Sequence, residues 1–272
     1  LHSAIMGREV VKESDGKVWL RCGSGETWDD IVAYAVEKGW HGAENLSLIP
    51  GKVGASAVQN IGAYGAEAKD LITKVEAVEI ATGNVVEFSN EDCRYAYRQS
   101  RFKDEWKDHY VITYVTYCFS LDFCPDLDYG NIRHSLEEQG ISKPTAQQLR
   151  QTIINIREAK LPDPKVTGNA GSFFMNPVVG RDVYERLAAQ YEGMPHYVVD
   201  ADHIKIPAGW MIEQCGWKGA SLGRAGVHDR QALVLVNRGG ATGEEVVTLY
   251  KRIIEDVRAK FGIEIHPEVN VI

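Results

Sequence analysis

The sequence lacks a long apolar run, and this absence excludes membrane-spanning helices. A helix needs about 20 consecutive apolar residues to cross a bilayer. In these 272 residues, even the apolar run Ala232–Val236 is only long enough for a buried strand. We therefore expect no membrane as a partner.

Cysteines are few and show no disulfide or metal-binding pattern. The five are odd in number, widely spaced and without a CxxC pair: Cys22, Cys93, Cys118, Cys124 and Cys215. We interpret them as reduced thiols in a reducing compartment, the cytoplasm, and expect no metal. No basic start followed by an apolar stretch marks a secretory signal, and the first residue is Leu1, from which we expect the natural N-terminus to be absent.

A basic stripe is also lacking. The chain has 30 Lys and Arg against 38 Asp and Glu, a formal net charge of -8. The basic residues are scattered among acids, so no surface is expected to neutralise a phosphate backbone. We expect no nucleic-acid partner.

What is present is the composition of a soluble globular protein, with 44% hydrophobic and 25% charged residues. The length favours two domains of ordinary size. Two prolines in the stretch Leu161–Pro164 exclude a helix and stiffen the chain, which is typical of a boundary. We predict one domain over residues 1–161 and another over 162–272.

Local patterns predict an α+β protein with mixed or antiparallel sheets. Strands and helices do not alternate one for one, as a doubly wound parallel sheet requires, and GxGxxG is absent, so a Rossmann site is not expected. Strands are predicted at residues 17–22, 75–80, 84–88, 110–119, 172–176 and 232–236 and in the C-terminal tail. Capping residues predict four helices. One begins near Thr27, and a short one opened by Ser89 and Asp92 carries Tyr97 and Arg98. A third runs from Thr145 and Gln148 to about Lys160, and a fourth from Thr242 and Glu245 to Gly262.

Residues 49–65, IPGKVGASAVQNIGAYG, form the first candidate binding segment. Small residues expose backbone N–H groups, which can cradle a pyrophosphate or contact an isoalloxazine edge. A glycine-rich loop is more often purely structural, so that alternative stays open.

Three further residues are candidates for chemistry, each with a simpler alternative. Ser172 lies between small residues and two aromatics, where a hydroxyl can be held near a substrate, or it only turns the chain into a strand. Arg98 suits an anionic substrate or a developing enolate, or it is a solvated surface arginine. Glu268, beside Pro267, can act as an acid, or it is an ordinary glutamate at a strand edge.

Four motifs, in this order and at this spacing, resemble one family. They are IPGKVGASAVQNIGAYG, CRYAYRQSRFK, KLPDPKVTGNAGSFFMNP and IHPEVNVI. Over about Gly23 to Ile272 they resemble the UDP-N-acetylenolpyruvoylglucosamine reductase family of bacterial cell-wall synthesis. The resemblance implies a flavin-contacting domain of the vanillyl-alcohol-oxidase-like type and a smaller α+β substrate domain. It also implies non-covalent FAD, NADPH as co-substrate and UDP-N-acetylglucosamine enolpyruvate as substrate; we expect a monomer.

The resemblance also implies roles for individual residues. Flavin N5 gives hydride to C3 of the enolpyruvyl group and Ser172 gives the proton to C2, which yields UDP-N-acetylmuramate. Arg98 and Glu268 correspond to the pair that stabilises the developing enolate, and the three residues are expected to line one cleft. The residues expected at the cofactor are Ile49, Pro50, Gly51, Gly54, Gln59, Asn60, Gly62, Ala63, Tyr64 and Gly65. Those expected at the substrate are Tyr97, Tyr129, Lys160, Asn176 and Gln231.

Two features qualify this interpretation. Tyr129, in DLDYG, resembles the tyrosine on a loop that folds over UDP in one subgroup, although a surface tyrosine is the alternative. Nothing before Gly23 matches the family's first glycine-rich segment, so we expect that segment to be missing. A truncated module that binds the UDP-sugar without flavin is therefore an alternative function, whereas a flavin oxidase of another alcohol or sugar is disfavoured by the substrate-domain motifs.

Overall fold

The computed structural model describes residues 2–271 and divides the chain into two compact units. These are Leu1–Arg157 and Glu158–Ile272, and the boundary falls in the last turn of helix α4 (Ala146–Lys160). All strand pairs among the described residues are antiparallel, which confirms the predicted α+β class. No helix within residues 2–271 is both long and apolar enough to span a bilayer.

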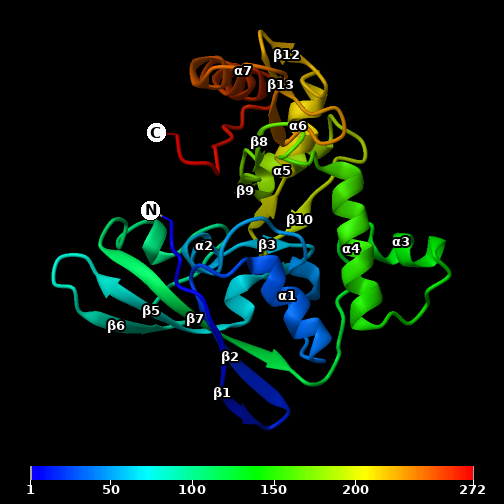
Figure 1. Cartoon of the computed structure of the whole chain (residues 1–272). Helices are drawn as coiled ribbons and strands as arrows, with labels where there is room; N and C mark the ends of the chain where they lie inside the picture. The colour runs from blue at the N-terminus through cyan, green and yellow to red at the C-terminus, as the bar shows by residue number, and fades with distance from the viewer. Residues whose placement is uncertain (1, 272) are drawn as a thin grey trace. The chain divides into compact units, whose positions relative to one another are not determined.

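The first unit is built on a five-stranded sheet with the strand order β1-β2-β7-β5-β6 (Figure 1). Its strands are β1 (Arg8–Ser14), β2 (Lys17–Gly23), β5 (Ile72–Glu79), β6 (Val85–Ser89) and β7 (Tyr110–Ser120), with a separate small hairpin of β3 (Gly62–Ala63) and β4 (Ala66–Glu67). Its helices are α1 (Trp28–Glu37), α2 (Val53–Gln59), α3 (Ile132–Glu138), most of α4, and the short 3-10 helices η1 (Glu44–Leu46), η2 (Ala68–Asp70) and η3 (Arg101–Lys103).

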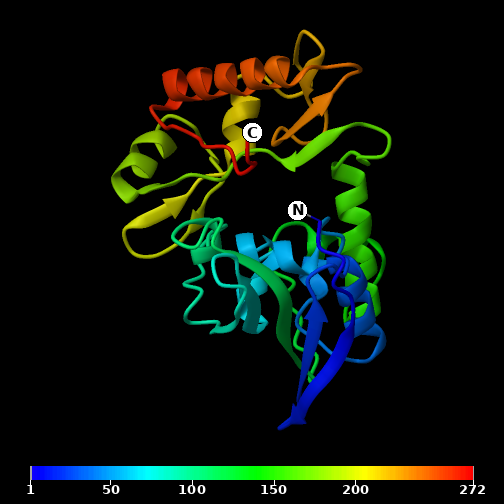
Figure 2. The same cartoon turned by 60° about the vertical axis from the view of Figure 1, so that its left-hand side comes forward.

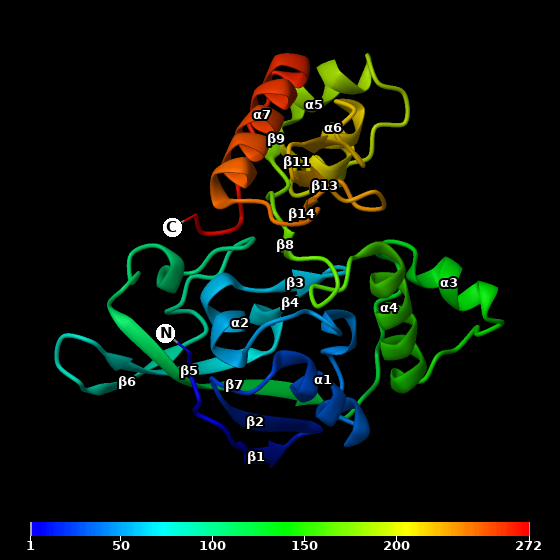
Figure 3. The ribbon, with the colours of Figure 1, turned by 45° about the horizontal axis from the view of Figure 1, so that its top comes forward.

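Alternating burial fixes the register of this sheet. In β2, Val18, Leu20 and Cys22 point into the core while the residues between them are half-buried. Helices α1 and α2 cover that face of the sheet, as Figure 3 shows, and bury Trp28 against Tyr117. The Ser56 hydroxyl of α2 also forms a 2.7 Å hydrogen bond with the Tyr117 hydroxyl of β7, which fixes α2 on the sheet and positions the glycine-rich segment around it.

The second unit contains a four-stranded sheet, β12-β13-β14-β8, and a three-stranded sheet, β10-β11-β9. Its strands are β8 (Asn169–Ser172), β9 (Val178–Gly180), β10 (Tyr197–Val198), β11 (His203–Lys205), β12 (Ser221–Leu222), β13 (Ala225–Val227) and β14 (Val234–Asn237). Its helices are α5 (Arg181–Ala188), α6 (Ala208–Gln214) and α7 (Gly243–Phe261), of which α7 packs on α6 and β13 (Figure 2). Apolar residues of all three helices form one core with the strands.

Of the four helices predicted from capping residues, three are confirmed and one is wrong. Helix α1 begins directly after Thr27, although the Thr27 side chain makes no capping hydrogen bond. The reciprocal hydrogen bonds of Thr145 with Gln148 and of Thr242 with Glu245 open α4 and α7. The Ser89 backbone N–H and hydroxyl also donate to Asp92, at 2.8 and 2.6 Å, but no helix follows. The chain instead forms turns there, because two arginines, at 94 and 98, adopt positive φ, and such residues interrupt a helix.

The strands near the predicted site are displaced along the chain. The strand expected at 172–176 is β8, which ends at Ser172, and the strand expected at 232–236 is β14. The C-terminal tail forms no strand within the described residues, although Pro267 makes a single bridge to Phe174. The hairpin expected at 75–88 is confirmed as β5 and β6.

Candidate functional site

The glycine-rich segment begins as an exposed turn and continues into α2. Ile49 is half-buried and Pro50 and Gly51 are exposed. Gly51 has a φ of 123°, and a Cβ at this position would meet nothing within 4 Å, so its backbone is open to a ligand. Gly54 faces inward, where a Cβ would lie 2.9 Å from the Ser24 Cβ, so this glycine allows close packing.

Asn60 ends α2, directly after Gln59, and is fully buried. Its φ of 46° is left-handed, a conformation that asparagine adopts more readily than most residues. The side-chain amide donates to Glu67 Oε2 at 3.1 Å and to the Ala96 carbonyl at 2.8 Å, and its oxygen accepts from the Lys69 N–H at 2.9 Å. Asn60 therefore links the glycine-rich segment to the turn that carries Tyr97 and Arg98.

The β3–β4 hairpin closes through a two-residue turn of Tyr64 and Gly65 after Ala63. Both turn residues have positive φ, 48° and 84°, as a type I′ turn requires. A Cβ at Gly65 would lie 3.4 Å from the Tyr129 ring, so the loop that carries Tyr129 packs on this turn. Asn45 joins the two segments, since its amide donates to the Tyr64 carbonyl at 2.9 Å and to the Asp126 carbonyl at 3.0 Å.

Arg98 points back onto the same hairpin. Its Nη2 donates to the Gly62 carbonyl at 2.6 Å, and its guanidinium lies 5.2 Å from the centre of the Tyr97 ring. A Cβ at Gly62 would lie 2.8 Å from Arg98 Nη1, so only glycine leaves room for this contact. Within the first unit, the structure thus brings Arg98 and Tyr97 against one part of the segment expected to bind the cofactor.

Arg157 is a candidate that the sequence interpretation missed. It is half-buried on α4, and its Nε is buried with no hydrogen-bond partner among the described residues. Burial lowers the pKa of Arg157, and the nearby charge of Arg98 lowers it further, while the Tyr64 hydroxyl and Asp29 act in the opposite direction. Two guanidinium groups and an unpaired N–H close to the glycine-rich segment favour an anionic ligand.

Asp29 balances part of this positive charge. Arg150 binds its carboxylate with both arms, at 2.7 and 2.8 Å, and the Leu48 N–H donates to it at 2.5 Å. Burial raises the pKa of Asp29, but these hydrogen bonds and the charge of Arg150 outweigh that effect and hold the pKa below its ordinary value. Because Arg150 already occupies the carboxylate, Arg157 keeps an unpaired donor.

Ser172 and Glu268 lie close together within the second unit. Ser172 is the exposed last residue of β8, opposite Val234. The next residue, Phe173, is buried and accepts a hydrogen bond from the Glu268 N–H at 2.8 Å through its carbonyl. The Ser172 and Glu268 backbones are therefore adjacent, and the rings of Phe173 and Phe174 contact each other edge to face.

Two predicted substrate residues each lie against the start of α6. Asn176 Oδ1 accepts from the Ala208 N–H at 2.9 Å, and Gln231 Oε1 lies 3.3 Å from where a Cβ of Gly209 would be. Lys160, by contrast, is exposed at the end of α4.

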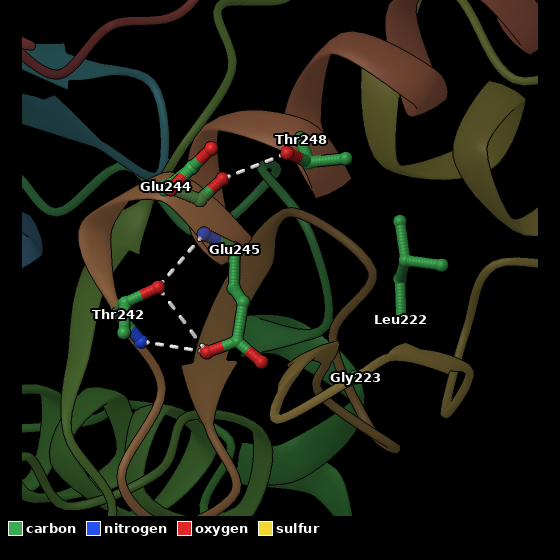
Figure 4. Close-up of a pocket in the computed structure, with 6 residues that line it drawn as sticks. All are labelled: Leu222, Gly223, Thr242, Glu244, Glu245 and Thr248. Atoms are coloured by element: carbon green, nitrogen blue, oxygen red, sulfur yellow. Dashed lines mark hydrogen bonds between the residues drawn. The ribbon is translucent and has the colours of Figure 1, made fainter.

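A surface pocket at the start of α7 contains none of the predicted site residues. It is lined by Leu222, Gly223, Thr242, Glu244, Glu245 and Thr248 (Figure 4). The hydrogen bonds that cap α7 occupy its polar groups, and the Thr242 N–H together with Arg224 lowers the pKa of Glu245 to about 2. We interpret this pocket as a feature of helix capping.

Two groups of the first unit suit a flavin dinucleotide. The exposed backbone at Gly51 admits a flat or anionic group, and the unpaired Nε of Arg157 supplies a charged donor. None of the described residues forms a cluster that could hold a metal ion.

Comparisons with known proteins point to the same chemistry. A family model described as "UDP-N-acetylenolpyruvoylglucosamine reductase, C-terminal domain" matches residues 163–272, and one described as "FAD binding domain" matches residues 3–89. The UDP-N-acetylenolpyruvoylglucosamine reductase of Bacteroides fragilis is 57% identical over 100% of this chain, which spans 81% of that protein. That of Porphyromonas gingivalis is 52% identical over 100% of the chain and 80% of its own length. The crystal structure of UDP-N-acetylenolpyruvylglucosamine reductase from Thermus caldophilus shares the fold, with a TM-score of 0.63 at 22% identity over 95% of this chain and 74% of that chain.

Proposed function

The chain belongs to the UDP-N-acetylenolpyruvoylglucosamine reductase family, and from this membership we propose that it reduces UDP-N-acetylglucosamine enolpyruvate to UDP-N-acetylmuramate. The same membership supports a cytoplasmic role in peptidoglycan synthesis, and through it in cell shape and cell division. The identity of 57% over the whole chain is the single observation that carries this proposal.

Non-covalently bound FAD is the cofactor of the proposed reaction. When bound, it supplies hydride from N5 to C3 of the enolpyruvyl group, after reduction by NADPH. We assign its binding to the first domain, residues 1–161, through the residues of the glycine-rich segment named above other than Asn60, whose amide is already occupied by Glu67, Ala96 and Lys69. Arg157 is added as a charged donor. The match of the FAD-binding model to residues 3–89 supports this assignment.

Ser172 is the proposed proton donor to C2. A serine hydroxyl is a weak acid, so its placement matters more than its acidity. The exposed end of β8 leaves the hydroxyl accessible, while the next two residues, Phe173 and Phe174, are buried and fix the chain that follows. These features support the assignment of the proton transfer to Ser172.

Arg98 and Glu268 are the proposed pair that stabilises the enolate. Hydride addition at C3 moves negative charge toward the substrate carboxylate, and groups that bind this charge lower the barrier. The guanidinium of Arg98 remains charged and is already fixed at Gly62, so little reorganisation is needed.

Substrate recognition is assigned to five further residues. Lys160, Asn176 and Gln231 belong to the proposed second domain, 162–272, or its border, and Asn176 and Gln231 share the start of α6. Tyr97 and Tyr129 lie beside the glycine-rich segment. Their polar groups suit the diphosphate and sugar of a UDP-sugar.

Steady-state turnover tests this proposal. Without oxygen, the protein supplied with FAD should oxidise more than one equivalent of NADPH per flavin only when the enolpyruvyl UDP-sugar is present, and the product should be two hydrogens heavier than the substrate. UDP-N-acetylglucosamine, which lacks the enolpyruvyl group, is the control and should give no turnover. Colourless protein that binds the UDP-sugar and leaves NADPH unconsumed would instead support a flavin-free binding module.

A further inference from the structure

Arg98 is held in an unfavourable backbone conformation by a tight turn. Ala96 and Gln99 exchange both main-chain hydrogen bonds, at 3.0 and 3.1 Å, so Tyr97 and Arg98 are the two turn residues. Arg98 has a φ of 55°, in the left-handed region that residues with a Cβ seldom adopt. Such a conformation persists only where the surroundings enforce it.

The enforcing contacts all come from side chains near the turn. They are the hydrogen bonds from Asn60 Nδ2 to the Ala96 carbonyl at 2.8 Å, from Arg98 Nη2 to the Gly62 carbonyl at 2.6 Å, from Lys103 Nζ to the Arg98 carbonyl at 3.1 Å and from the Ser100 hydroxyl to the Val58 carbonyl. Three of these four bonds join residues 96–100 to residues 58–62. The base of the turn therefore cannot move without moving relative to α2 and the β3–β4 hairpin.

Asn60 is the central member of this set. It is fully buried, and all three hydrogen-bonding positions of its amide are occupied, by Ala96, Glu67 and Lys69. Only an uncharged amide can donate twice and accept once in this arrangement. Its left-handed φ of 46° would suit glycine equally well, so backbone conformation alone does not account for the side chain.

We propose that Asn60 is a positioning residue for Arg98. The inference rests on the proposed role of Arg98 in the reaction. By holding the Ala96 carbonyl, Asn60 keeps the turn in the conformation that directs the guanidinium to Gly62. Without the amide, Arg98 can return to negative φ and its guanidinium leaves the Gly62 carbonyl.

The variant Asn60→Gly tests this directly, because it keeps the left-handed conformation and removes only the amide. We expect the reoxidation of reduced flavin by the substrate to slow about ten- to hundredfold, the loss typical of a displacement of about 1 Å. The reduction of flavin by NADPH should stay within about twofold of the parental rate, because Arg98 has no role in that half-reaction. Asn90→Gly is the matched control: it removes an amide that donates to the Lys69 and Ile72 carbonyls at 2.8 and 2.7 Å, and should leave both rates unchanged.

A double-mutant cycle separates positioning from general loss of structure. If Asn60 acts through Arg98, then Asn60→Gly should slow the reaction no further in an Arg98→Ala background. Effects that multiply in the double variant would overturn the proposal. A parental protein that the substrate does not reoxidise would instead refute the proposed function itself.

Two further measurements keep the proposal testable if Asn60→Gly folds poorly or loses FAD. Lys103→Met removes the bond to the Arg98 carbonyl from a half-exposed position; we expect a loss of about threefold, again absent in the Arg98→Ala background. In protein without substrate, the Arg98 Nε–H NMR signal, assigned by its disappearance in Arg98→Lys, should be sharp in the parent and broadened in Asn60→Gly. An unchanged signal in Asn60→Gly would mean that Asn60 does not position Arg98.

Discussion

Replacing Ser172 with alanine should remove the proton donor while leaving the fold unchanged. The side chain is exposed at the end of β8, and the pairing of this residue with Val234 uses only the backbone. Exposed substitutions of this kind change the free energy of unfolding by less than about 0.5 kcal/mol, which corresponds to a shift of about 2 °C or less in Tm. Any large kinetic effect is then chemical.

The expected loss of rate is much larger than this change in stability. A positioned general acid contributes roughly 10²- to 10⁴-fold, or about 2.7 to 5.4 kcal/mol of transition-state stabilisation. Stopped-flow absorbance separates the half-reactions: Ser172→Ala should be reduced by NADPH at the parental rate and reoxidised by substrate at least 100-fold more slowly. Ser221→Ala, at the other edge of the same sheet, is the control and should react like the parent. Reoxidation of Ser172→Ala at the parental rate would refute its role as the acid.

Three other substitutions test neighbouring parts of the account. Arg98→Lys should slow reoxidation about ten- to hundredfold, because a lysine cannot reproduce the forked guanidinium; a parental rate would exclude this role. Asn45→Asp should raise the KM for the UDP-sugar about tenfold and leave flavin reduction unchanged. A carboxylate cannot donate to the carbonyls of Tyr64 and Asp126, so the Tyr129 loop would no longer be held. An unchanged KM would contradict this. Glu76→Gln should lower the free energy of unfolding by about 2 kcal/mol at pH 7, since Arg21 binds Glu76 with both arms at 2.8 and 2.6 Å. The Arg21 hydrogen bonds lower the pKa of Glu76 in the folded protein. The stabilisation by this ion pair is therefore complete above the pKa of the unfolded chain, about 4.5, and is lost as the pH falls through the lower pKa of the folded protein. Urea unfolding should show the free energies of unfolding of the parent and Glu76→Gln converging in acid.

Short-range signals in the sequence predicted the elements that depend on them. The pairs Thr145–Gln148 and Thr242–Glu245 form reciprocal caps within four residues, so their helices could be placed to within about a residue. The pair at Ser89 and Asp92 forms the same bonds without a helix, because contacts of Ala96 and Arg98 with residues 60 and 62 hold the chain in a turn. A local signal thus fails where long-range packing determines the backbone.

In the candidate site too, local sequence identified some residues, whereas those defined by long-range contacts were missed. Motif resemblance selected Arg98, but it gave no indication that Asn60 and Gly62 hold its turn, since these contacts join residues more than 30 positions apart. Arg157 was also missed, because nothing in its local sequence distinguishes it from the other charged residues of an amphipathic helix. Its signal is the unpaired Nε, which exists only in the folded chain.

A single turnover followed by visible absorbance tests most directly whether the reduced flavin of this protein reduces the enolpyruvyl UDP-sugar. The FAD-loaded protein, reduced by one equivalent of NADPH without oxygen, should regain its oxidised flavin spectrum on addition of UDP-N-acetylglucosamine enolpyruvate, with one UDP-N-acetylmuramate formed per flavin. A spectrum that stays reduced in the presence of this substrate would contradict the account.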